Sequence, residues 1–318
     1  AIPDSEITKT YDVDVAIIGM GYAGLSCYRE LAEEGKNVLV LEAMPRESWW
    51  TVGHDIGHIN SDYLLSHGVP KVDEVEFVNN WMMQTHGKAN TALVMKFAKN
   101  SGSTVDWWLD KINPDTLAKT RIQFWPDNEY TVHQLNNGMH YYTGTLEWWE
   151  NYWENPASGE KNNNTAGQLE LKDLSWDNYN YVEENFSDNA TALFGTKGVQ
   201  LVIDGAKVTG VIAQDGDGNY LKINAKNGVV LAGGGFGGNK EMMDDLLPDI
   251  KRLFTKDEDF FAPFGRDGST IQMGVWAGGR LEGDISTMNF DSMAVPDYLP
   301  GPLWVDENGQ RFQNEAFA

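Results

Sequence analysis

A glycine-rich turn early in the chain has the residue types and the spacing that could hold a phosphate-bridged dinucleotide. Gly19 lets the chain turn tightly after an apolar run, Gly21 lets the backbone approach a pyrophosphate, and Gly24 lets the following helix pack close to a sheet. Tyr22 and Ala23 lie in the same turn. The helix that follows presents backbone N–H groups and a partial positive charge to phosphate oxygens.

An acidic residue, Glu42, ends the next apolar run. It lies close to the spacing of about 20 residues at which a carboxylate can accept hydrogen bonds from ribose hydroxyls. Ala43, which follows it, is a further candidate contact. The alternative is that the glycines form only a structural tight turn. Both NAD and FAD fit this first pattern, so the rest of the chain must decide between them.

A second stretch without large side chains follows the apolar residues that begin at Val229. Ala232, Gly233 and Gly234 carry nothing that would block a cofactor, so the backbone could lie directly against a dinucleotide. The alternative is a glycine turn that caps a helix.

The elements that must position these turns are a strand at 13–18, a helix at 25–34 and a strand at 38–41, which together predict a parallel β-α-β unit. Apolar residues also recur at helical spacing in three later segments, 74–85, 89–99 and 103–111. Short strands are expected at 199–203, 208–213, 220–224 and 229–232. Asp-Gly turns separate the first three of these strands and predict a β-meander. We therefore expect an α/β fold, with a Rossmann-type domain that carries a helical insertion and a meander.

The composition excludes several classes of protein. The chain has 47 acidic residues against 24 Lys and Arg, so its net charge is −23, and it would repel nucleic acid and anionic membranes. No apolar run reaches the roughly 18 residues of a membrane span. The single cysteine, Cys27, excludes an internal disulfide framework and a cysteine-rich metal site. The acidic excess is typical of a solvated surface, or of a surface that docks a basic electron donor such as a cytochrome.

The chain begins at Ala1. This start is compatible with an exported bacterial protein whose signal has been removed, and equally with a shortened chain, so a cytoplasmic location is the alternative.

Three later segments, Val229–Met242, Gly265–Gly268 and Val305–Glu315, resemble the fumarate reductase and succinate dehydrogenase flavoprotein superfamily and stand in its order. The Gly57–Ser61 stretch and the tryptophan-rich helices after it are similar to a branch of soluble, often exported bacterial flavin reductases. The resemblance implies that the cofactor is FAD, bound by an FAD-binding type 2 domain.

The resemblance also implies which residues contact FAD. Thr51, Val52, Ile56 and Gly57 match cofactor-contacting positions, although Trp49-Trp50-Thr51 replaces the usual Gly-Gly-Asn. Gly198 matches the strand that touches the adenine, and Asp267 matches an acid near the ribityl chain and phosphates; Asp267 could also be a helix N-cap. The full predicted set is Gly19, Gly21, Tyr22, Ala23, Gly24, Glu42, Ala43, Thr51, Val52, Ile56, Gly57, Asn60, Ser61, Gly198, Ala232, Gly233, Gly234 and Asp267.

Two histidines, His54 and His58, are four residues apart. Metal ligands, a polar contact beside the flavin and a structural histidine with its hydrogen bonds satisfied are the alternatives for this pair. We predict no metal site, because no third ligand accompanies them.

The domain limits follow from these assignments. We expect an N-terminal arm at 1–10, an FAD-binding domain at 11–282 with a tryptophan-rich helical excursion at 63–190, and the start of an α+β capping domain at 283–318.

By resemblance, the chain is an FAD-dependent oxidoreductase that reduces an activated C=C bond of a small organic substrate by hydride transfer from flavin N5, with a cytochrome or flavin carrier as a possible electron donor. No catalytic residue is assigned, because the arginine that supplies the proton in this superfamily would lie beyond Ala318. Fumarate itself is disfavoured, since the residues between Leu281 and Trp304 lack the superfamily's substrate-holding segments. The alternatives are a dehydrogenase of the ketosteroid Δ1 type and a flavin electron-transfer module without a substrate.

Overall fold

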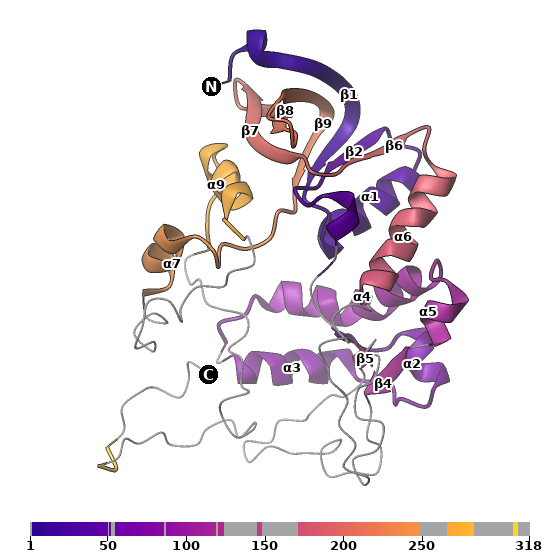
Figure 1. Cartoon of the computed structure of the whole chain (residues 1–318). Coiled ribbons are helices and arrows are strands. Elements are labelled where there is room, and N and C mark those ends of the chain that lie inside the picture. The colour runs from indigo at the N-terminus through magenta and orange to yellow at the C-terminus, as the bar shows by residue number, and fades with distance from the viewer. Residues whose placement is uncertain are drawn as a thin grey trace. The chain divides into compact units, whose positions relative to one another are not determined.

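A six-stranded sheet in the order β6-β2-β1-β9-β8-β7 forms the centre of the first of two units in the computed structural model (Figure 1). The first unit comprises Ala1–Gly53 and Leu171–Thr287, and the second comprises His54–Glu170 and Met288–Ala318. The structure describes residues 2–49, 51, 55–85, 87–118, 120–123, 145–147, 171–248, 266–282 and 308–310. Val52, His54 and nearly all of the predicted capping segment at 283–318 lie outside the described residues.

The predicted parallel β-α-β unit is confirmed. It consists of β1 (Ile7–Ile18), α1 (Tyr22–Glu33) and β2 (Val38–Leu41), and β1 and β2 pair in parallel with Val15 opposite Val38. The helix α6 (Leu171–Asn185) leads into β6 (Ala190–Leu193), which pairs in parallel with β2.

The first strand begins earlier than predicted, at Ile7 rather than Val13, so the expectation of a loose arm at 1–10 is wrong for its last four residues. Ile7 pairs with Tyr220, and Thr10 pairs with Lys222, both of them in β9. The polar composition of this segment hid the strand, because its partner lies more than 200 residues along the chain. A short 3₁₀ turn, η1 (Asp4–Glu6), precedes it.

The predicted meander is present as β7 (Lys197–Asp204), β8 (Lys207–Gln214) and β9 (Tyr220–Leu231), which pair antiparallel in sequence. The two strands predicted at 220–224 and 229–232 form one strand, β9, since its whole length pairs with β1. The pairing continues across a register shift opposite Val13 to Val15. Two helices, α7 (Lys240–Leu246) and α9 (Ser269–Trp276), follow the sheet.

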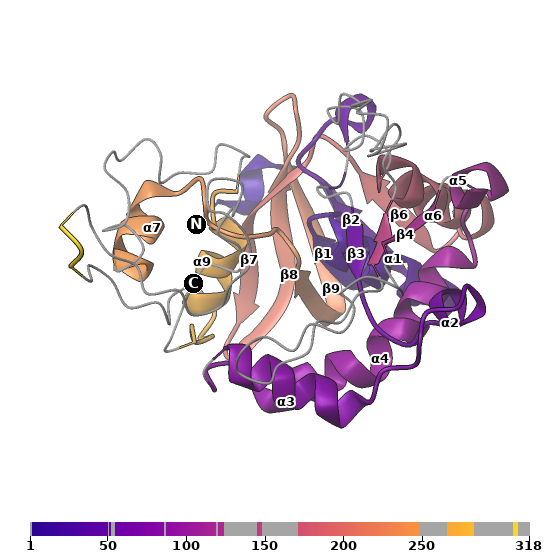
Figure 2. The same cartoon turned by 90° about the horizontal axis from the view of Figure 1, so that it is seen from below.

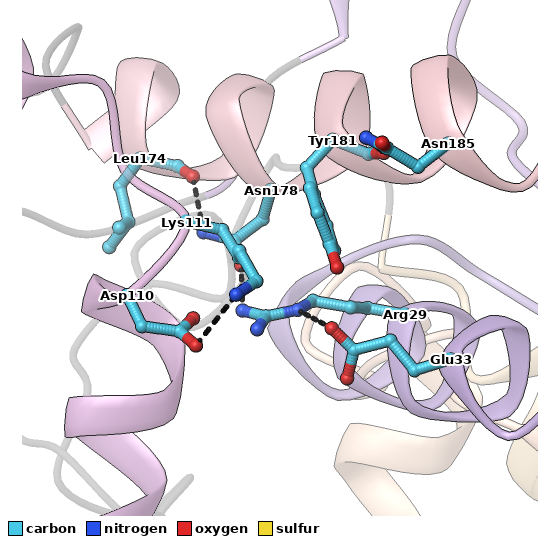
Figure 3. A network of polar contacts seen from close by, with 8 residues as sticks. All are labelled: Arg29, Glu33, Asp110, Lys111, Leu174, Asn178, Tyr181 and Asn185. Carbon is cyan, nitrogen blue, oxygen red and sulfur yellow. Dashed lines mark hydrogen bonds and ion pairs between the residues drawn. The ribbon is translucent and has the colours of Figure 1, made fainter.

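The core of the first unit lies on the sheet and joins strands of both orientations. Its buried members are Ala16, Ile18, Leu39, Leu41, Val211, Ala213, Leu221, Ile223, Ala225 and Met273. A buried arginine, Arg29, fixes α1 against α6 (Figure 3). Its guanidinium donates to Asn178 Oδ1 at 2.8 Å and to Glu33 Oε1 at 3.0 Å, and the Tyr181 ring lies 5.3 Å from it. The helix that follows the glycine-rich turn is therefore held rigidly.

The second unit is mainly helical. Figure 2 shows α3 (Glu74–Gln84) and α4 (Thr91–Leu109) side by side. The second unit also contains the helices α2 (Asp62–Ser66) and α5 (Pro114–Ala118) and a three-stranded antiparallel sheet of β3 (Asp55–Gly57), β5 (Thr145–Glu147) and β4 (Arg121–Gln123). A short 3₁₀ turn, η2 (Arg46–Ser48), belongs to the first unit.

The helices predicted separately at 89–99 and 103–111 form the single helix α4. Gly102 lies in the middle of α4, and a Cβ atom there would meet the backbone of Ile59 and Asn60 at 2.6 Å. The glycine therefore serves a close helix–backbone contact and does not end the helix. Within the described part of the chain, no helix is long and apolar enough to span a bilayer.

Candidate functional site

Three neighbouring strands of the first unit, β2, β1 and β9, end at the same edge of the sheet, and β1 and β9 continue into turns with few side chains. Gly21 follows β1, Ala43 follows β2, and Gly233 follows β9, and all three residues are exposed. The Gly19 N–H donates to Leu41 O at 2.8 Å, and the Ala232 N–H donates to Ile18 O at 2.8 Å, so the three turns are tied together. Nucleotides bind at such carboxyl ends of parallel strands.

The three glycines of the first turn occupy different environments. Gly19 has a φ of 94°, and a Cβ atom there would lie 2.5 Å from Ala232 O. A Cβ atom on Gly24 would collide with the Gly19 carbonyl. Nothing lies within 4 Å of the corresponding position on Gly21. The structure thus requires glycine at 19 and 24 for packing, whereas Gly21 borders open space.

The N-terminus of α1 is suited to an anion. The helix has 12 residues, its first turn contains no acidic side chain, and its N-cap, Gly21, has no side chain to bond the first N–H groups. Ala23 is exposed and Tyr22 is half-buried in this turn. The positive end of the helix dipole therefore lies beside open space without a competing carboxylate in its first turn.

The carboxylate of Glu42 is buried, with 8% of the residue exposed, and faces the glycine-rich turn. Its Oε2 accepts from the Met20 N–H at 2.8 Å, and its Oε1 accepts from the Met44 N–H at 2.8 Å. Each oxygen retains a lone pair. The side chain is therefore held in one orientation and can still accept bonds from hydroxyl groups.

Asp267 lies one residue before the N-cap of α9, which is Gly268, so the prediction that Asp267 is the N-cap is wrong, although its side chain bonds the first residue of the helix. Its Oδ1 accepts from the Ser269 N–H at 3.0 Å, and its Oδ2 pairs with Lys197 Nζ at 2.5 Å. Burial alone would raise the pKa of Asp267, but the bonds from Lys197 and Ser269 outweigh it and hold the pKa at about 2. The carboxylate is ionised and about half exposed, so it can also serve a ligand.

The remaining glycines at the sheet edge differ in the same way as those of the first turn. A Cβ atom on Gly198 would lie 2.9 Å from the Ile18 side chain, and one on Gly233 would collide with Thr270 of α9. Gly234 has a φ of 83° and borders open space. Packing therefore explains Gly198 and Gly233, while Gly234 leaves the backbone accessible.

Thr51 is buried, and its hydroxyl lies 2.6 Å from Ser175 Oγ of α6. This hydrogen bond gives Thr51 a partner within the first unit. Its predicted cofactor contact stays a prediction, and the neighbouring Val52 lies outside the described residues.

The predicted residues Ile56, Gly57, Asn60 and Ser61 belong to the second unit, so the first unit does not contain them. Ile56 and Gly57 lie in β3. Asn60 has a φ of 60°, and its side-chain amide exchanges two hydrogen bonds with the Val72 backbone, at 2.8 and 3.0 Å. Ser61 is the N-cap of α2 and accepts from the Leu64 N–H at 3.1 Å.

His58 is buried in the second unit and has both ring nitrogens bonded. Its Nδ1 lies 3.0 Å from Ile56 O and its Nε2 lies 2.7 Å from Ser61 Oγ. A carbonyl only accepts, so Nδ1 carries the proton and the Ser61 hydroxyl donates to Nε2. Burial lowers the pKa of His58, and the bond to Ile56 O and the charge of Asp106 oppose this more weakly. Of the alternatives for the histidine pair, His58 matches the structural histidine whose hydrogen bonds are satisfied.

One residue at the sheet edge was missed by the sequence reasoning. Trp49 is buried, and its indole N–H donates to Met20 O, in the glycine-rich turn, at 3.2 Å. The only signal in the sequence was the replacement of the superfamily's glycines by Trp49-Trp50, which indicates a difference at this place but not a contact.

The comparisons with known proteins agree with this geometry. The FAD binding domain family matches residues 14–317. A 4-oxocyclohex-2-ene-1-carboxylate 5-dehydrogenase from Sinomonas cyclohexanicum is 33% identical over 131 residues, which cover 36% of this chain and 21% of that protein. A vinyl phenol reductase from Lactiplantibacillus plantarum is 24% identical over 324 residues, 98% of this chain and 58% of that protein.

Among solved structures, the open conformation of a flavocytochrome c3 fumarate reductase has the same fold, with a TM-score of 0.57 and 18% identity, over 86% of this chain and 41% of that one. The chain thus spans less than two thirds of each of these proteins.

The residues at the sheet edge fit a flavin dinucleotide. The open space at Gly21 and the uncapped positive end of α1 suit a pyrophosphate in size and charge, and the fixed carboxylate of Glu42 suits a partner with hydroxyl groups. The chain belongs to the FAD binding domain family, within the superfamily of fumarate reductase and succinate dehydrogenase flavoproteins, and its cofactor is FAD.

Proposed function

We propose that this chain is the FAD-carrying part of an oxidoreductase that reduces an activated C=C bond in a small organic molecule. The observation that carries the proposal is the meeting of two side-chain-poor turns, after β1 and β9, with the carboxylate of Glu42 after β2, at adjacent strand ends beside the N-terminus of α1. FAD, when bound, supplies hydride transfer at flavin N5.

The residues of the first unit have separable roles in this proposal. The backbone at Gly21 and Ala23 binds the pyrophosphate with the help of the α1 dipole, because no side chain blocks the approach. Glu42 accepts hydrogen bonds from the ribose hydroxyls while its bonds to Met20 and Met44 hold it in place. Gly234, in the turn after β9, borders open space, so the backbone there is accessible to the cofactor. Asp267 accepts from hydroxyl groups of the ribityl chain in addition to accepting from the Ser269 N–H.

The direction of the reaction is proposed as reduction. The likeness to a vinyl phenol reductase extends along 98% of this chain, and it supports an unsaturated substrate without requiring fumarate. The likeness to a dehydrogenase covers 36% of the chain and favours oxidation as the second candidate.

Anaerobic stopped-flow measurements separate the two directions. The protein is loaded with FAD, and the flavin absorbance is followed in two experiments. Reduced protein is mixed with a panel of small enoates and vinyl phenols, and oxidised protein is mixed with their saturated counterparts and with saturated cyclic ketones. Reoxidation by an unsaturated compound, without reduction by any saturated one, supports the proposal. Flavin reduction by a saturated compound supports the dehydrogenase instead.

A flavin electron-transfer module is the candidate of another class. The acidic excess, 47 carboxylates against 24 basic residues, would complement a basic donor such as a cytochrome. In that case the bound flavin exchanges electrons with the donor at a rate that falls steeply with added salt, and no organic compound of the panel reoxidises it.

A further inference from the structure

Both backbone groups of Met20, between the first two glycines of the turn, are held by side chains from outside the turn. The Met20 N–H donates to Glu42 Oε2 at 2.8 Å, and the Met20 carbonyl accepts from Trp49 Nε1 at 3.2 Å. The spacing along the chain predicts Glu42 at this turn but does not predict Trp49. The two bonds fix two successive peptide groups, Gly19–Met20 and Met20–Gly21.

The position of the Trp49 ring is set by packing, so its N–H has a defined direction. The residue is 1% exposed. Its ring lies 4.9 Å from that of Trp176 in an edge-to-face arrangement, and 5.9 Å from those of Tyr179 and Phe194. Such aromatic contacts hold a ring in a single orientation. The indole therefore acts as a rigid donor aimed at the turn.

The planarity of the peptide bond links this donor to the ligand side of the turn. The Met20 carbonyl and the Gly21 N–H belong to one planar trans peptide group, and they point in opposite directions. Because Trp49 holds the carbonyl, it also directs the Gly21 N–H away from the aromatic cluster. Glycine on its own would allow this peptide group to rotate.

We propose that Trp49 is a positioning residue for the phosphate-binding turn, which orients the Gly21 N–H for the pyrophosphate through the Met20 carbonyl. The proposal rests on the proposed binding of FAD at this turn. It assigns Trp49 no contact with the cofactor and no part in the chemistry. It also gives a physical reason for a large aromatic residue at a place where the superfamily has glycine: the indole adds an anchor from behind the turn.

The experiment compares Trp49→Phe with Trp176→Phe in the FAD-free protein. Both variants remove one indole N–H from the same cluster and leave an aromatic ring. The Trp176 Nε1 atom is buried and has no hydrogen-bond partner among the described residues, so its loss is a matched control. Affinities for FAD, ADP and riboflavin are measured by isothermal titration calorimetry, and melting temperatures are recorded alongside.

We expect Trp49→Phe to weaken the binding of ADP and of FAD by the same factor, about threefold to tenfold, as the loss of one orienting hydrogen bond implies. Riboflavin, which has no pyrophosphate, should bind Trp49→Phe as it binds the wild type. Trp176→Phe should bind all three ligands as the wild type does. A loss confined to pyrophosphate-containing ligands is not produced by general destabilisation.

Two results overturn the inference: unchanged affinity of Trp49→Phe for ADP, and an equal loss of affinity in both variants. If the wild type binds neither FAD nor ADP, the proposed function fails and the inference fails with it. If the wild type binds both and Trp49→Phe does too with equal affinity, only the inference fails. Should Trp49→Phe not fold, Trp49→benzothienylalanine, an isostere that keeps the ring volume and lacks the N–H, gives the same decision.

Discussion

The carboxylate of Glu42 and the backbone N–H of Met20 are joined by a 2.8 Å hydrogen bond that ties the end of β2 to the turn after β1. The second oxygen of the same carboxylate holds the Met44 N–H. One side chain thus organises two backbone segments at the edge where three strands end, and it does so from a buried position.

Replacing Glu42 by alanine should weaken FAD binding by about tenfold or more. The change leaves the N–H groups of Met20 and Met44 without their acceptor, at a cost of about 1–3 kcal/mol, and it removes the proposed acceptor for the ribose hydroxyls. FAD affinity is measured by fluorescence quenching of added flavin. Glu47→Ala is the control, since Glu47 is exposed nearby. Equal affinity in Glu42→Ala and Glu47→Ala would contradict the role given to Glu42.

Gly21→Ala and Gly24→Ala should separate binding from folding. A methyl group on Gly21 enters open space, so the melting temperature should stay near that of the wild type, while FAD affinity falls by about tenfold, or 1.4 kcal/mol. A methyl group on Gly24 collides with the Gly19 carbonyl, so unfolding free energy should fall by about 1–3 kcal/mol. Thermal melts and FAD titrations of both variants test this. A stable Gly21→Ala with wild-type FAD affinity would place the pyrophosphate elsewhere.

Asp267→Asn distinguishes the two roles of this residue. Asparagine can still accept from the Ser269 N–H at the start of α9, and the ion pair with Lys197 is half exposed, so the melting temperature should change little. FAD affinity should fall, because the amide has one acceptor oxygen where the carboxylate has two. Lys197→Met, which keeps the carboxylate, is the control and should retain FAD. If Asp267→Asn binds FAD as tightly as the wild type, Asp267 serves only the backbone at the start of α9.

The pKa of Asp267 also predicts a pH dependence. A carboxyl group whose folded pKa is depressed to about 2 contributes stability that is present above its unfolded pKa of about 4 and is lost as the pH falls toward 2. The contribution of the Asp267–Lys197 pair to the free energy of unfolding should therefore stay constant between pH 5 and 8. Denaturant unfolding of wild type and Asp267→Asn should differ by a constant amount across that range, and by less at pH 3.

His58 should make the second unit less stable in mild acid. Its folded pKa lies below the unfolded value of about 6.5, so its contribution is fully present above pH 6.5 and is lost as the pH falls through the folded pKa. Unfolding free energies of wild type and His58→Gln, measured between pH 5 and 8, should converge toward the acid end. His67→Gln, a change at an exposed histidine, should keep the wild-type slope. A parallel slope in His58→Gln would show that His58 does not carry the effect.

The parts of the fold that could be predicted from the sequence are those encoded locally. The β-α-β unit follows from apolar runs at strand and helix spacing, and the turn at Gly19 follows from glycine positions that a tight turn and a packed helix require. The pairing of Ile7 and Thr10 with β9 could not be predicted in this way, because both residues stand in a polar segment whose partner is distant in sequence.

Other features depend on tertiary contacts that no local pattern encodes. Gly102 interrupts an apolar pattern, yet α4 runs through it because the backbone at Ile59 and Asn60 packs against it. The bond from Trp49 to Met20 is equally invisible, since a tryptophan in place of glycine predicts only added volume. The cofactor contacts assigned to Thr51, Ile56, Asn60 and Ser61 stay predictions. The hydrogen bonds that these four residues make in the structure go to protein groups of their own unit.

The pairing of β1 with β9 has a consequence for folding during translation. Thr8 bonds to Tyr220, 212 residues further along, so β1 leaves the ribosome long before β9 is translated. Residues Val15 to Ile18 can already pair with β2, but the edge of β1 that faces β9 stays unpaired while residues 54–170 of the second unit are translated. Nascent chains halted before β9 should therefore aggregate or stay bound to holdases, and release should coincide with the emergence of the meander.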